Sequence, residues 1–175
     1  MQRFNSFFSH SILLGFLCLS ITGNANDISQ SDKYFLQNVA ETGHYELEGS
    51  RLALKKAKDA EVVKFAKRMT EDHGNARASL RSLASSKGVE LSKKPSPAQQ
   101  NKLENLNEKE GTSFDKLFAS TIAVSAHEQA VKLLEEAAEK AEDSDVKKFA
   151  SDTLPIMKTH LEEAKRVNAV VNNEN

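Results

Sequence analysis

The sequence predicts an all-α fold, a bundle of four long helices, and three observations support this prediction. The 175 residues contain many helix-forming Ala, Leu, Lys and Glu residues but only seven glycines, three prolines and no tryptophan. Apolar residues recur over long stretches at the three- and four-residue spacing of a helix face. The chain has the length of a single domain. Such a composition with this periodicity is typical of helical bundles.

Residues 1–25 have the pattern of a cleaved secretory signal peptide. Arg3 supplies a positive charge, and residues 12–21 form an apolar run that is too short to span a bilayer. Small residues at Gly23 and Ala25 then suit cleavage after Ala25. We therefore predict an exported protein, either periplasmic or secreted.

The remaining chain, residues 26–175, is predicted to be one domain without cysteine or a membrane-spanning segment. Cys18 follows Leu17, whereas a lipidated cysteine would follow a small residue, so we do not expect a lipid anchor. Acidic and basic residues alternate along the chain, and the formal net charge is −1. This balance gives no electrostatic support for nucleic-acid binding. Homo-oligomer formation and protein partners stay open.

The first long helix is predicted to begin at Asp32, with Ser31 or Asp32 as its N-cap. It ends before a turn at Asp59, which is the expected N-cap of the second helix. That helix runs to Lys87, and Gly88 takes the position usual for a C-terminal glycine. Both helices are long enough for a four-helix bundle.

Residues 88–111 form an unusually long connection between two long helices. Ser96 and Gln99 have the spacing of a capping box, and Pro97 takes the first helical position. They predict a short helix that ends near Asn107. A connection of this length suits a full-length crossover, which would make the second and third long helices parallel and the bundle ferritin-like.

The third and fourth long helices are predicted over residues 113–141 and 145–171. The sequence of residues 57–66 is echoed by residues 141–150, so the chain contains two related helical hairpins.

Each long helix places one side chain of a metal-ligating type on its apolar face. These side chains are Glu46, His73, His127 and His160. The first two lie 13 and 14 residues from the turn at Asp59, and the last two lie 16 and 17 residues from the turn at Asp143. At about 1.5 Å per residue, the four side chains reach a common depth near the middle of the bundle.

Two interpretations of these four residues stay open. Three imidazoles and one carboxylate would suit one Zn²⁺, Cu²⁺, Fe²⁺ or Ni²⁺ ion, with Asp72 as an alternative ligand or a residue that orients one. Imidazoles must be neutral to bind, so such a site should weaken as the pH falls through the histidine range near 6. Alternatively, the residues form a polar network that fixes helix register in a non-enzymatic envelope protein.

Di-iron chemistry is not expected, and no catalytic residue can be assigned. The residues three positions before the histidines are Thr70, Val124 and Met157, so the Glu-x-x-His pairs of a di-iron centre are absent. The pair Glu41 and His44 has this spacing, but it lies off the apolar face and is interpreted as a surface contact.

Several short segments along the chain are similar to the bacterial family called domain of unknown function 4142. They are Phe35-Leu36, Glu46-Leu47-Glu48-Gly49, Phe65-Ala66-Lys67-Arg68-Met69 with Asp72-His73, Phe114-Asp115, His127, Thr153-Leu154-Pro155 and His160-Leu161. The resemblance covers nearly all of the predicted domain. It implies a secreted ferritin-like bundle and brings no established activity.

Overall fold

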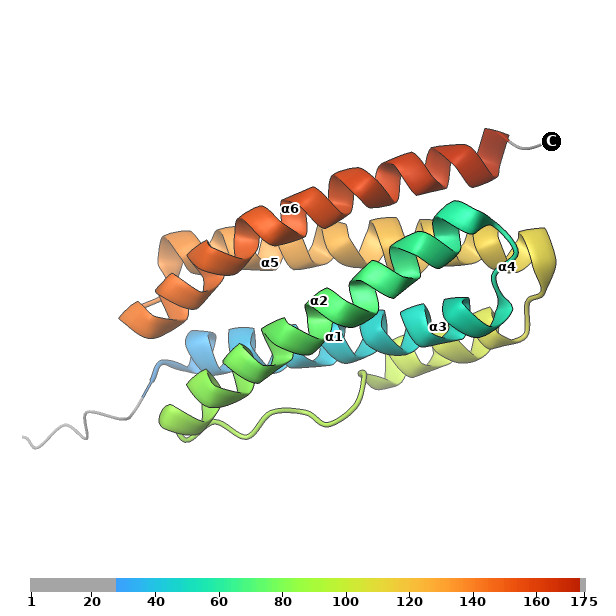
Figure 1. Ribbon diagram of the computed structural model, residues 1–175. Coiled ribbons are helices and arrows are strands. Elements are labelled where there is room, and N and C mark those ends of the chain that lie inside the picture. The colour runs from blue at the N-terminus through green and yellow to red at the C-terminus, as the bar shows by residue number, and fades with distance from the viewer. Residues whose placement is uncertain (1–27, 174–175) are drawn as a thin grey trace, which may run out of the picture.

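A computed structural model of the protein describes residues 28–173, and all regular structure in that range is helical (Figure 1). The elements are α1 (Gln30–Lys56), α2 (Ala60–Ser86), α3 (Pro97–Asn107), α4 (Gly111–Phe118), the π-helix η1 (Ala119–Ser125), α5 (Ala126–Lys140) and α6 (Ser144–Asn173). The all-α prediction is confirmed. The predicted signal peptide and Cys18 lie outside the described residues. None of the described helices is both long and apolar enough to cross a membrane.

Helices α1, α2 and α3 each begin at a residue whose side chain caps the first turn. Ser29, and not Ser31 or Asp32, caps α1, and its hydroxyl accepts the backbone N–H of Asp32 at 3.1 Å. The helix therefore begins two residues earlier than predicted. Asp59 caps α2 by accepting two N–H groups of the first turn, as predicted. Ser96 caps α3 with the predicted capping box.

Two buried aspartates join the two helical hairpins in equivalent ways. Asp32 of α1 accepts the backbone N–H of Asp143 in the α5–α6 turn at 2.9 Å. Asp115 of α4 accepts the N–H groups of Lys58 and Asp59 in the α1–α2 turn at 3.0 to 3.2 Å. The turn of each hairpin is thus held by the first helix of the other.

The contacts at the two turns show in which directions the long helices run. Both α2 and α4 begin at the α1–α2 turn, where Asp115 contacts Asp59. Both α2 and α5 end near the α5–α6 turn, where Lys87 pairs with Asp143 at 2.7 Å. Consequently α2 and the α4–η1–α5 segment run in the same direction (Figure 1).

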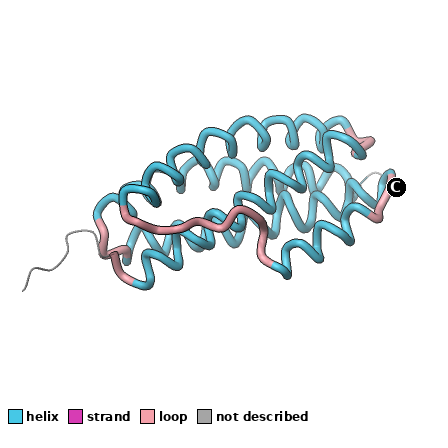
Figure 2. Tube along the Cα trace, turned by 90° about the horizontal axis from the view of Figure 1, so that it is seen from below, coloured by secondary structure: helices cyan, strands magenta, loops and turns pink. Residues whose placement is uncertain are grey.

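The connection between α2 and α4 follows the bundle along α1 (Figure 2). Near its start, the carbonyl of Glu90 accepts a hydrogen bond from Gln37, in the N-terminal part of α1. At its end, Glu110 pairs with Lys56 at the C-terminal end of α1, with 2.8 Å between Oε1 and Nζ. The chain therefore returns along the full length of α1, which is the path that a crossover requires.

The third long helix is less regular than predicted. The sequence predicts one helix over residues 113–141, whereas the structure has α4, η1 and α5 in direct succession. At the end of η1, the N–H of Ala126 bonds to the carbonyl of Thr121, five residues earlier. Such π-helical segments are rare and often lie at functional sites. Here η1 ends two residues before His127.

The interior contains two apolar clusters, one toward each end of the bundle. On α2, Met69 belongs to one cluster and Leu80 to the other. On α5, Ala126 belongs to the cluster of Met69 and Val131 to the cluster of Leu80. The change from one cluster to the other occurs at the predicted histidine level, so polar residues there are enclosed by apolar packing from both sides.

Candidate metal centre

The structure brings the predicted residues together in the bundle interior. Glu46 comes from α1, His73 from α2, His127 from α5 and His160 from α6. Their exposed fractions are 2%, 6%, 0% and 0%, so all four are buried. The predicted convergence at one depth is confirmed. It follows from helix faces and helix heights, both of which the sequence specifies.

The histidine cluster, defined as His73, His127 and His160, forms a nearly equilateral triangle. Its ring centroids are 5.7, 5.8 and 5.7 Å apart. One nitrogen from each ring lies within 4.8 Å of the other two. To bind one ion through metal–nitrogen bonds of about 2.0 Å, the three nitrogens would have to lie closer together than this limit.

Glu46 lies beside the histidine cluster and is not part of the close group of ligand atoms. Its Oε2 is 3.4 Å from Nδ1 of His73, and its Oε1 is 3.6 Å from Nδ1 of His127. Nδ1 of His127 is also 3.3 Å from the carbonyl oxygen of Ile122 in η1. The sequence predicts Glu46 as a fourth ligand, and the structure places its carboxyl group near Nδ1 of two of the rings, those of His73 and His127.

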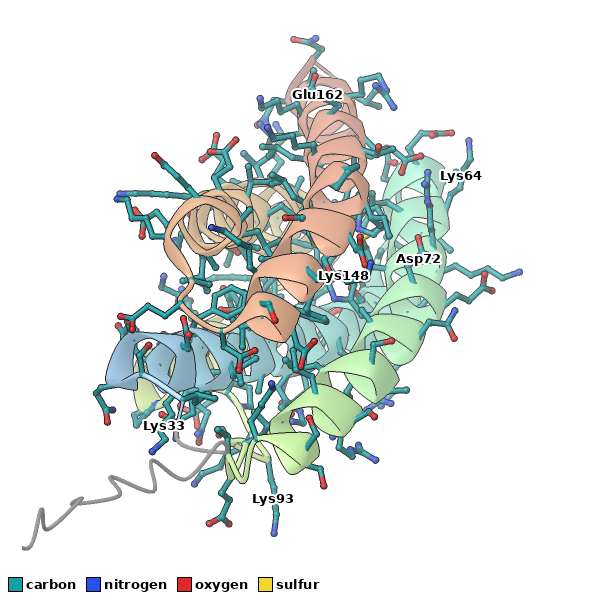
Figure 3. All side chains as sticks on the ribbon, turned by 90° about the vertical axis from the view of Figure 1, so that its left-hand side faces the viewer. Lys33, Lys64, Asp72, Lys93, Lys148 and Glu162 are labelled. Carbon is teal, nitrogen blue, oxygen red and sulfur yellow. The ribbon has the colours of Figure 1, made fainter. Side chains whose placement is uncertain are left out.

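Asp72 has the same relationship to the third ring. Its Oδ2 is 2.8 Å from Nε2 of His160, and this contact joins α2 to α6. Asp72 is labelled on α2 in Figure 3. Arg68 contacts Asp72 at 3.4 Å and Glu163 at 2.7 Å, so the carboxylate is itself oriented. Of the two roles predicted for Asp72, orienting a histidine is the one that this geometry supports.

Four buried polar atoms around the cluster lack a hydrogen-bond partner. They are Nε2 of His73, Nε2 of His127, Nδ1 of His160 and Oε1 of Glu46. In each ring, one nitrogen faces a carboxyl or carbonyl group, and the other nitrogen has no partner. A metal-bound histidine usually has this arrangement, with one nitrogen on the ion and the other on an oxygen acceptor.

Burial makes the imidazoles neutral at physiological pH. Burial, together with His127 and His160, lowers the pKa of His73 to about 3. Burial also lowers the pKa of His127 to about 4, with His160 contributing, and it lowers the pKa of His160. The neutral imidazole is the form that binds a metal, so no proton would have to leave the rings at pH 7.

The two carboxyl groups differ in charge. Burial raises the pKa of Glu46 to about 8, so Glu46 is mostly protonated at pH 7. Its contacts with His73 and His127 at this pH join neutral groups and are not salt bridges. Burial also acts to raise the pKa of Asp72, but His160 and Arg68 outweigh it and lower that pKa. Asp72 is therefore the ionised carboxylate of the site.

A cavity of about 690 Å³ extends from the surface to the histidine cluster. Its lining includes the buried Glu46 and His73 and also the exposed Arg81, Glu90 and Lys93. The cavity therefore connects the buried Glu46 and His73 with exposed residues of α2 and of the α2–α3 connection. An ion bound by the cluster would be within reach of a small molecule that enters the cavity.

His44 is a lining residue whose position differs from the sequence prediction. The predicted surface pair with Glu41 is replaced by a contact with α2, in which His44 Nε2 lies 3.4 Å from Nη2 of Arg77. Burial and the charge of Arg77 lower the pKa of His44. The cavity could have been predicted from the small residues that line it, because they leave space between the helices. They are Ala40, Gly43, Ala76, Ala84 and Ala130.

Comparisons with known proteins agree with the fold. Residues 20–167 match the model of a family described as "Domain of unknown function (DUF4142)". Among solved structures, the crystal structure of a DUF305 fragment from Deinococcus radiodurans matches with a TM-score of 0.71 and 12% sequence identity. That match covers 82% of this chain and 98% of the other, and at this identity it concerns the fold alone. A search of curated proteins found no match.

Proposed function

The chain belongs to the family described as "Domain of unknown function (DUF4142)", and because that description names no activity, we propose a function from the histidine cluster. The protein is an exported ferritin-like bundle that binds one transition-metal ion through His73, His127 and His160. Zn²⁺, Cu²⁺, Fe²⁺ and Ni²⁺ are the candidates, because imidazole nitrogen suits each of them.

The observation that carries the proposal is the set of unpartnered ring nitrogens. Each ring of the cluster has one buried nitrogen without a hydrogen-bond partner and one nitrogen facing an oxygen of Glu46, Ile122 or Asp72. A polar network that only fixed helix register would be expected to satisfy its own members, because an unpaired buried polar atom costs about 1–3 kcal/mol. A bound ion would satisfy all three nitrogens at once.

Glu46 and Asp72 support the ion without binding it. When His73 binds through Nε2, its Nδ1–H is free to donate to Glu46. His160 binds through Nδ1 and donates Nε2–H to Asp72 in the same way. Three histidines leave a further coordination position, as in catalytic zinc sites, and the cavity beside Glu46 and His73 gives access to it.

Export is proposed from the apolar run at residues 12–21 and the small residues that follow it. A site made of imidazoles suits an oxidising compartment, because it contains no thiolate that oxidation would destroy. The ferritin-like arrangement is proposed from the shared direction of α2 and α5 and from the long connection between them.

Metal titration of protein purified without a histidine tag and freed of metal by chelation tests the proposal. A binding ion at 100 times its Kd stabilises the native state by about 2.7 kcal/mol, which corresponds to a rise in Tm of roughly 5–10 °C. We expect such a rise with at least one of the four ions, at one ion per chain.

Two variants locate the effect. His127→Ala should abolish the rise in Tm, while His44→Ala, which changes a histidine outside the cluster, should keep it. If His127→Ala does not fold, His73→Gln takes its place, because His73 is the least buried of the three. An unchanged wild-type Tm with every ion would favour the structural role of the histidines and reject the metal site.

A further inference from the structure

The cavity beside the histidine cluster has a chemical character of its own. Its volume of about 690 Å³ is within the range of small-molecule sites. Much of its lining is apolar and comes from α1, α2, the α2–α3 connection, α5 and α6. The larger apolar side chains include Val39, Leu80, Val89, Leu91, Leu133 and Met157. Such a lining favours a ligand with an apolar body.

Two arginines, Arg77 and Arg81, line the cavity, and Arg81 is exposed at the surface. Arg77 and Arg81 lie four residues apart on α2, so they are neighbours on one helix face. Arg77 contacts the half-buried ring of His44 at 3.4 Å. Within residues 28–173, neither arginine forms an ion pair with a carboxylate.

Acidic residues near this end form no ion pair with Arg77 or Arg81 within the described part of the chain. Glu48 acts on His44 and raises its pKa, against the lowering by Arg77 and Arg81. Glu90 lines the cavity, and its backbone carbonyl accepts a hydrogen bond from Gln37. The opposite, buried end holds Glu46 and His73, neither of which carries a charge at pH 7.

We propose that this cavity binds a small amphipathic anion, a molecule with an apolar chain or ring and one carboxylate group. The carboxylate is held by Arg77 and Arg81, whose planar guanidinium groups suit two-point binding of a carboxylate. The apolar body extends inward between α1, α2 and α5. Lys93 is on the connecting loop at the edge of the molecule (Figure 3) and is not needed for this contact.

Binding of the anion does not depend on a bound metal ion. Of the histidine cluster, only His73 lines the cavity. The anion contacts residues that are not metal ligands, so binding is expected in metal-free protein. A cationic ligand is disfavoured by the two arginines, and a purely apolar one would leave them unused.

An NMR titration of metal-free protein with octanoate tests the proposal, with 1-octanol as a neutral molecule of the same chain length. Octanoate should bind saturably at one molecule per chain, at least tenfold more tightly than 1-octanol. Chemical-shift changes should concentrate at Leu80, Leu133 and Met157. The double variant Arg77→Gln/Arg81→Gln should weaken octanoate binding at least tenfold and leave 1-octanol binding unchanged.

The control variant is Arg166→Gln, which changes an exposed arginine of α6 outside the cavity. It should bind octanoate like the wild type. The proposal is overturned if octanoate does not saturate, if the shift changes map elsewhere, or if the double variant binds octanoate as tightly as Arg166→Gln. All of these measurements use metal-free protein, so their outcomes do not decide whether the histidine cluster binds a metal.

Discussion

Gly49 of α1 and Ile122 of η1 are so close that a Cβ atom at Gly49 would lie 2.9 Å from three side-chain carbons of Ile122. Each of these two residues lies next to a residue of the candidate metal centre. Glu46 lies one turn before Gly49, and the carbonyl of Ile122 faces the ring of His127 at 3.3 Å. The absence of a side chain at Gly49 therefore sets how closely α1 approaches the helix that carries His127.

Gly49→Ala is expected to destabilise the protein. The added methyl group would force Ile122 or α1 to move, which costs about 1–3 kcal/mol of unfolding free energy in a packed core. The comparison is Gly74→Ala, because a Cβ at Gly74 would meet nothing within 4 Å. That variant should gain up to about 1 kcal/mol from helix propensity. Urea unfolding of both variants measures the difference, and equal stability would contradict the close-contact argument.

Asp72→Asn is expected to weaken metal binding without removing a ligand. An amide keeps the size of the side chain but removes the negative charge from Nε2 of His160. Loss of such a partner typically costs 10- to 100-fold in metal affinity. Asp152→Asn is the matched control, since Asp152 pairs with Lys148 on the surface of α6. Competition with a chromophoric chelator measures the affinities, and equal values for the two variants would assign Asp72 no part in the site.

The stability of the metal-free protein should pass through a maximum near pH 6.5. Above that pH, the raised pKa of Glu46, about 8, has the largest effect on stability. Between pH 6.5 and 8 the native state holds a proton on Glu46 that the unfolded state has released. Stability therefore falls as the pH rises toward 8. Below pH 6.5, the lowered pKa values of His73 and His127 mean that the unfolded state takes up more protons, so stability falls as the pH falls.

Glu46→Gln isolates one side of this maximum. Glutamine cannot titrate, so the loss of stability between pH 6.5 and 8 should disappear, while the loss below pH 6.5 remains. Chemical unfolding at half-unit pH steps in the presence of a chelator gives both slopes. An unchanged alkaline slope in Glu46→Gln would show that another group causes it.

Metal binding should persist well below pH 6, where the sequence alone predicts that it weakens. That expectation uses the ordinary histidine pKa, whereas burial lowers the pKa of His73 to about 3 and that of His127 to about 4. The rise in Tm on adding metal should therefore remain at pH 5 in a non-coordinating buffer. Its disappearance between pH 7 and 6 would mean that the rings are protonated more easily than their burial indicates.

The sequence by itself determined that the fold is all-α and which residues reach a common depth. Asp59 and Ser96 specify helix starts through local hydrogen bonds, and these need only neighbouring residues. Helical periodicity identifies the inward faces of His73, His127 and His160, and their distances from the turns give their heights. Both quantities are properties of single helices or hairpins, so they can be counted along the chain.

Only the tertiary structure decided what each residue does at that depth. Glu46 faces Nδ1 of two histidine rings because of the spacing between helices, which depends on remote packing such as that of Gly49 on Ile122. The neutral state of the rings results from burial by apolar clusters whose members come from all of the described helices. The contact of His44 with Arg77 likewise joins two helices. Side-chain spacing along one helix carries no information about the distance to the next, so these features arise only when the helices pack.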